Sequence, residues 1–111
     1  MATIIGRFYF KLTDAGNLIG EYSNSAGTRS LPESAMRKDG SEVGGFVSSY
    51  MSTWFEPSAG AGVAALLKIE PKSESSDLFE LTWCEIAGNS DLYKGEAMLC
   101  DGMLIGNYWS V

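Results

Sequence analysis

A chain of 111 residues with 45% hydrophobic and 20% charged residues is long enough for one globular core, so residues 1–111 are expected to form a single soluble domain. Its net charge of −6 and its scattered Lys and Arg residues argue against nucleic acid or an anionic membrane surface as a partner. With no histidine and only two cysteines, Cys84 and Cys100, the chain lacks the residues for a Ser/His/Asp or Cys/His nucleophile or a usual zinc site.

The first predicted elements are two β-strands. In residues 3–12 (TIIGRFYFKL), Phe8, Phe10 and Leu12 fall on one face, and the residues between them fall on the other. This period of two is typical of a strand with one buried face. Residues 13–17 contain Asp, Gly and Asn and predict a turn, after which residues 18–25 form the return strand.

The next segment, residues 26–44, has no obvious alternation, and we predict one short helix in it. Ser30 and Glu33 have the spacing of a capping box, with a proline in the first turn between them. Arg37 then falls in the last turn, where a cation suits the helix dipole, and Gly40 can end the helix. The alternative is an irregular surface loop.

The rest of the chain again predicts strands separated by turns. Asp101-Gly102 between the last two strands is a strong signal for a tight hairpin, because both turn residues then need a positive φ. A meander of about seven or eight antiparallel strands removes its exposed edges by closing, so we predict an all-β, up-and-down barrel, with a β-sandwich as the alternative. The strands predicted here are 45–56, 63–70, 78–86, 92–100 and 103–111.

Two hairpins carry a similar sequence. Residues 16–22 (GNLIGEY) and 102–108 (GMLIGNY) share Gly, Leu, Ile, Gly and Tyr at matching positions. We expect Gly20 and Gly106 to mark bends, bulges or places where a large side chain packs over the backbone.

The chain resembles the calycin group of barrels, which includes lipocalins, fatty-acid-binding proteins and avidins. The resemblance rests on Gly-x-aromatic at the start of the first strand (residues 6–9) and Gly-x-Tyr-Trp at the end of the meander (106–109). Residues 16–22 are similar to the avidin motif Gly-x-Leu-Thr-Gly-x-Tyr, whose Tyr donates to the biotin ureido oxygen and corresponds to Tyr22. Ile19 replaces the motif's Thr, and Phe8 and Phe10 replace a Trp and a ligand-binding Asn, which argues against biotin.

Ligand-binding candidates come from the aromatic residues of the predicted strands. One face of residues 46–54 carries Phe, Ser, Tyr, Ser and Trp in turn, a mixture of rings and hydroxyls that suits a pocket able to stack a ligand and hydrogen-bond it. The alternative is that these side chains simply fill the barrel. The candidate ligand-binding residues are Tyr22, Tyr50, Trp54, Trp83 and Tyr108.

Three functions stay open at this point. The leading one is non-enzymatic binding of a small apolar or aromatic ligand inside the barrel. The second is recognition of a protein or glycan through the outer surface, with Tyr9 and Trp109 exposed and Trp109, Ile105 and Val111 forming an apolar stripe that a homo-oligomer would cover. The third is an isomerase or cyclase that uses Tyr, Asp or Glu, although no catalytic residue is singled out.

No cofactor is expected. Residues 60–65 (GAGVAA) match a dinucleotide fingerprint, but the segment before the next proline is too short for the helix that the fingerprint requires. We expect a β-hairpin loop there instead. The N-terminal residues lack the charge and apolar pattern of a secretory signal and no apolar stretch approaches the length of a membrane span, so a cytoplasmic protein with reduced thiols is expected.

Overall fold

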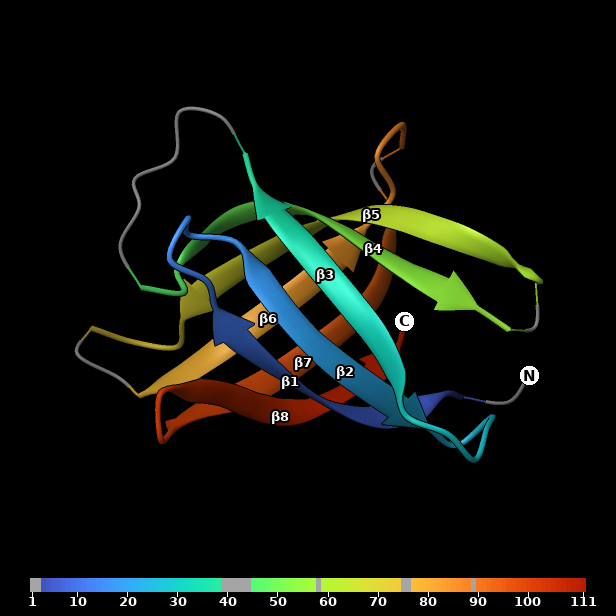
Figure 1. Ribbon diagram of the computed structural model, residues 1–111, viewed down its shortest axis with the longest axis horizontal. Helices are drawn as coiled ribbons and strands as arrows, with labels where there is room; N and C mark the ends of the chain where they lie inside the picture. The colour runs from blue at the N-terminus through green and yellow to red at the C-terminus, as the bar shows by residue number, and fades with distance from the viewer. Residues whose placement is uncertain (1–2, 39–44, 58, 75–76, 89) are drawn as a thin grey trace.

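The computed structural model shows a closed, eight-stranded antiparallel barrel, as the alternating sequence predicts (Figure 1). It describes residues 3–38, 45–57, 59–74, 77–88 and 90–111. Each strand pairs with its neighbours in the sequence, and β1 pairs with β8 to close the barrel. The strands are β1 (Ile5–Leu12), β2 (Leu18–Asn24), β3 (Leu31–Arg37), β4 (Ser48–Glu56), β5 (Ala61–Pro71), β6 (Leu78–Cys84), β7 (Asp91–Cys100) and β8 (Met103–Ser110).

The core fills the middle of the barrel with side chains from alternate strand positions. Phe8 and Phe10 of β1 point inward as predicted, and Leu67, Leu81 and Leu104 meet them from other strands. The face of residues 46–54 that carries Phe, Ser, Tyr, Ser and Trp is also the inward face. Charged residues on β5, β6 and β7 alternate with these positions and are exposed, so the period of two decides which side chains form the core.

The predicted short helix is wrong over residues 31–37, which form strand β3; residues 39–44 lie outside the described residues. Leu31–Arg37 pairs with β2 on one side and with β4 on the other. Its inward positions are Glu33 and Ala35, so the strand has no apolar alternation to reveal it. Pairing on both sides overrides the local capping pattern, and no helix is present among the described residues.

The similar sequences of β2 and β8 occupy equivalent places, because these strands pair with opposite sides of β1. Gly20 lies opposite Phe10 and Gly106 lies opposite Phe8. A β-carbon on Gly20 would overlap the carbonyl oxygen of Tyr9, and one on Gly106 would overlap that of Glu96. The two glycines therefore mark close backbone approaches, with backbone atoms rather than a bulge or a large side chain as the nearest neighbours.

The turn between β7 and β8 has the conformation that its sequence predicts. Asp101 and Gly102 have φ of 51° and 76°, the left-handed pair that the predicted tight turn requires. Residues 60–65 belong to the β4–β5 hairpin and the start of β5, with no crossover helix there.

Cys84 and Cys100 are free and lie at opposite ends of the β6–β7 pair. In the described part of the chain no helix is long and apolar enough to cross a membrane.

Candidate functional site

A small cavity lies at the end of the barrel where β1 begins and β8 ends. Figure 1 shows both chain termini at this end. The strands that supply the lining either begin here (β3 and β7) or end here (β2, β4, β6 and β8). We call this space the end cavity; its volume is about 20 Å³. Its lining residues are Tyr22, Asn24, Glu33, Trp54, Glu56, Trp83, Tyr93 and Tyr108.

Five aromatic rings form a connected cluster around the end cavity. Tyr108 is at its centre, with ring centroids 5.5 Å from Tyr93, 6.0 Å from Trp83 and 6.4 Å from Tyr22. Trp54 joins through Tyr93 at 6.3 Å. Most of these pairs are edge-to-face, an arrangement that aromatic quadrupoles favour. The rings support one another, so the walls of the cavity are preorganised.

Glu33 is the buried polar group of the end cavity, with 7% of its surface exposed. Its Oε2 accepts hydrogen bonds from Ser52 Oγ at 2.6 Å and from Trp83 Nε1 at 2.8 Å. Its Oε1 accepts none from the described residues, yet no fully buried side-chain oxygen or nitrogen among them lacks a partner. Oε1 is therefore not fully enclosed, and because Glu33 lines the cavity, we infer that this oxygen faces it.

The electrostatic environment of the end cavity is negative. Burial raises the pKa of Glu33 to about 7, although the hydrogen bonds from Ser52 and Trp83 oppose the shift. Burial is the main cause that raises the pKa of Tyr22 and of Tyr108 to about 12, and the charges of Glu56 and Glu33 contribute to this shift. No Lys or Arg is among the lining residues that the structure describes.

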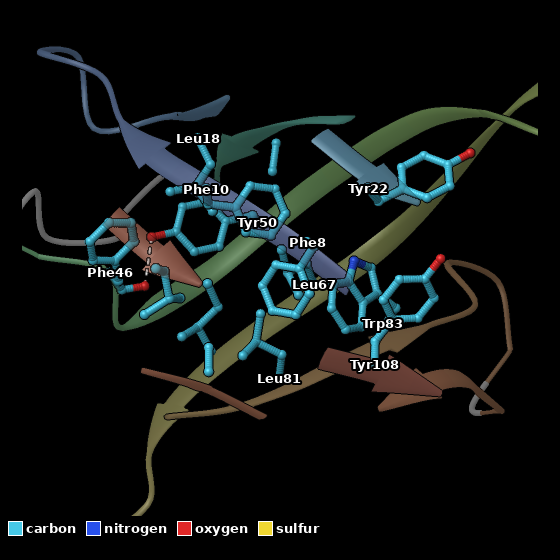
Figure 2. Close-up of a cluster of buried hydrophobic side chains, with 14 of the residues drawn as sticks. Phe8, Phe10, Leu18, Tyr22, Phe46, Tyr50, Leu67, Leu81, Trp83 and Tyr108 are labelled. Carbon is cyan, nitrogen blue, oxygen red and sulfur yellow. Dashed lines mark hydrogen bonds between the residues drawn. The ribbon is translucent and has the colours of Figure 1, made fainter. Parts of the chain in front are cut away.

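The hydroxyl groups at the mouth are held in place. Tyr22 donates to the carbonyl oxygen of Phe55 at 2.6 Å, and Asn24 Nδ2 donates to Tyr108 Oη at 2.9 Å. Figure 2 shows that both tyrosine hydroxyls point away from the cluster of core side chains. Trp54 Nε1 makes a longer contact of 3.4 Å with Glu56 Oε1 on the rim.

The opposite end of the barrel is closed by Tyr50 and Arg37. Tyr50 is fully buried, and its hydroxyl donates to the carbonyl oxygen of Phe46 at 2.7 Å (Figure 2). The Arg37 guanidinium lies 5.0 Å from the Tyr50 ring centroid and donates to Tyr50 Oη at 3.1 Å and to the carbonyl oxygen of Gly16 at 2.8 Å. Arg37 is thus the last residue of β3 rather than part of the last turn of the predicted helix, and its side chain lies against Tyr50 at this end.

The structure brings together four of the five residues predicted to bind a ligand: Tyr22, Trp54, Trp83 and Tyr108 all line the end cavity. Tyr50 is separated from them by the core (Figure 2). Sequence reasoning missed Asn24, Glu33, Glu56 and Tyr93. The only sequence signal for Glu33 was the alternate spacing that places it on one strand face with Ala35 and Arg37. Charged residues at such positions usually indicate an outward face, so this signal did not mark Glu33 as buried.

Comparison with known proteins transfers no role to this chain. No protein-family model, curated protein or solved structure matches it. In the described part of the chain, no group of three or more Cys, Asp or Glu side chains is placed to hold a metal ion.

Proposed function

We propose that this protein binds a small ligand with an aromatic or apolar body at the end cavity, without chemical change to the ligand. The observation that carries the proposal is the convergence of five aromatic rings and the accessible Oε1 of Glu33 on one opening. Ligand sites commonly combine apolar walls with a few placed polar groups, and the mouths of β-barrels are frequent locations. The eight-stranded meander and the calycin resemblance agree with this use of the fold.

The volume of the end cavity limits how the ligand binds. About 20 Å³ is room for roughly one water-sized group. The ligand therefore places a small head group inside the cavity and rests its body on the rim, where Tyr93, Glu56 and Asn24 are only half-buried. A ligand enclosed in the middle of the barrel is not supported, because core side chains occupy that space.

Binding fits the site better than catalysis does. Glu33 alone has a pKa that suits a general base near neutral pH. Two tyrosine hydroxyls of the lining that could serve as an acid, those of Tyr22 and Tyr108, have their pKa raised to about 12, which makes them poor proton donors. An isomerase or cyclase would need a matched acid in the same cavity.

The outer surface supports a second candidate function, recognition of a protein or glycan. Leu78, Met98 and Ile105 are exposed and lie side by side across β6, β7 and β8. They line a broad depression of about 860 Å³ on the outside of the barrel, which Tyr9 of β1 also lines. Trp109 and Val111 are exposed as expected. A second copy of the chain would be one way to cover this surface.

A pair of tyrosine variants separates the two functions. We expect benzylamine or benzyl alcohol to form a one-to-one complex with the wild-type protein, observed by native mass spectrometry and lost on denaturation. Tyr93→Ala removes a ring of the end cavity and should weaken the complex about tenfold. Tyr9 is a half-buried residue of the outer depression, so Tyr9→Ala should leave the stability of the complex unchanged. Loss of binding in Tyr9→Ala alone, or no complex with either compound, would overturn the proposal.

A further inference from the structure

We infer that the head group of the ligand is a primary ammonium cation, which enters the end cavity and donates a hydrogen bond to Glu33 Oε1. This inference rests on the proposed function and adds the chemical class of the ligand. Three independent features of the cavity support it: its charge, its aromatic lining and its size.

The charge of the lining favours a cation. Glu33 and Glu56 are its two carboxylates, and neither forms an ion pair with a Lys or Arg among the described residues. The face of an aromatic ring also attracts a cation, most strongly when water is excluded. Five rings and two carboxylates without a balancing cation would repel an anionic ligand and attract an amine.

The geometry of Glu33 directs the hydrogen bond. Ser52 and Trp83 both donate to Oε2 and hold the carboxylate in one orientation. The remaining oxygen, Oε1, has no partner among the described residues and is presented to the cavity. An ionised carboxylate only accepts hydrogen bonds, so the missing partner must be a donor, and a charged donor gives the stronger bond.

The size of the cavity selects among ammonium ions. A primary ammonium group is close to a water molecule in size and fits a volume of about 20 Å³, whereas a trimethylammonium group does not. One of the three N–H donors of the primary ammonium group binds Glu33 Oε1, and the rings of Trp83 and Tyr108 lie beside this group. The organic body of the amine then lies toward Tyr93 and Asn24 at the rim.

Isothermal titration calorimetry with four related probes tests the inference. At about pH 8, benzylamine is expected to bind about tenfold more tightly than benzyl alcohol, which has a similar shape and no charge. Phenylacetate should not bind, and benzyltrimethylammonium should bind more weakly than benzylamine because its head is too large. Equal affinity for benzylamine and benzyl alcohol would overturn the ammonium assignment and leave the proposed function intact. No binding of any probe would overturn both.

Two variants that each remove one negative charge localise the effect. Glu33→Gln keeps a carbonyl oxygen for Ser52 and Trp83 but turns an NH₂ group toward the cavity, so benzylamine should lose its advantage over benzyl alcohol. Glu80→Gln changes an exposed, outward residue of β6 and should retain that advantage. An equal loss in both variants would show a nonspecific effect of net charge and would contradict a contact with Glu33.

The pH dependence gives a second readout. Between about pH 6 and about pH 8 a primary amine stays protonated while Glu33 ionises, so the affinity for benzylamine should rise about tenfold with pH. The other titratable groups facing Glu33 are Glu56 and the tyrosines 22, 93 and 108, and the pKa of each tyrosine is raised away from this range. An affinity for benzylamine that does not change with pH would contradict the inference.

Discussion

Gly20→Ala is expected to cost about 4 kcal/mol or more of folding free energy, a large part of the stability of a domain of this size. The added methyl group would overlap the carbonyl oxygen of Tyr9 on the paired strand and would press on the Phe10 ring. Both neighbours are fixed, the first by the β1–β2 ladder and the second by complete burial in the core. Urea unfolding followed by tryptophan fluorescence measures the loss.

Gly62→Ala is the matched control for this prediction. Gly62 is also a strand glycine without a positive φ, but its β-carbon would meet nothing closer than the carbonyl oxygen of Trp54 at 3.9 Å. Alanine there should be neutral or stabilise the protein by about 0.5 kcal/mol, because it restricts the unfolded chain. Similar unfolding midpoints for Gly20→Ala and Gly62→Ala would contradict the close approach of β1 and β2.

The protein should be less stable at about pH 8 than at about pH 5 because of Glu33, by roughly 3 kcal/mol from this residue alone. Burial raises the pKa of Glu33 from 4.5 to about 7 in the folded protein. Between these two values the folded state holds a proton that the unfolded chain has released, so the free energy of unfolding falls as the pH rises. Above about pH 7 both states are ionised, and the contribution levels off.

Glu33→Gln is expected to remove this component of the pH dependence. The neutral side chain has no charge to bury and keeps the acceptor for Ser52 and Trp83, so the variant should exceed the wild type in stability at about pH 8 and match it near pH 5. Glu80→Gln should follow the wild-type curve, since residue 80 is exposed. The measurement is urea unfolding across this range. Parallel curves for wild type and Glu33→Gln would contradict a buried, destabilising carboxylate.

Seven of the eight strands could be predicted from the sequence, because their inward residues are apolar and alternate with polar ones. β3 could not be predicted in this way. Its inward residues Glu33 and Ala35 carry no apolar signal, and Ser30 with Glu33 imitates a helix start. Leu31–Arg37 forms a strand because it pairs with β2 and β4. This is a long-range effect that cannot be predicted from local propensity.

The aromatic part of the site could be predicted, and the acidic part could not. Tyr22, Trp54, Trp83 and Tyr108 are strand aromatics on inward faces, so alternation alone selects them. Whether they meet depends on strand register, which separates Tyr50 from the others and places it against Arg37. Glu33 gains its role only from burial beside Ser52 and Trp83, and those contacts come from two other strands.

The three tryptophans allow a direct test of whether the end cavity is the binding site. In a ¹H–¹⁵N NMR titration with benzylamine, the indole N–H signals of Trp83 and Trp54 should shift together and saturate, because these groups contact Glu33 and Glu56 in the lining. The indole signal of Trp109, which is exposed on the outside of the barrel, should stay in place. A shift of the Trp109 signal alone, or no shift of the Trp83 and Trp54 signals, would contradict a ligand site at this end of the barrel.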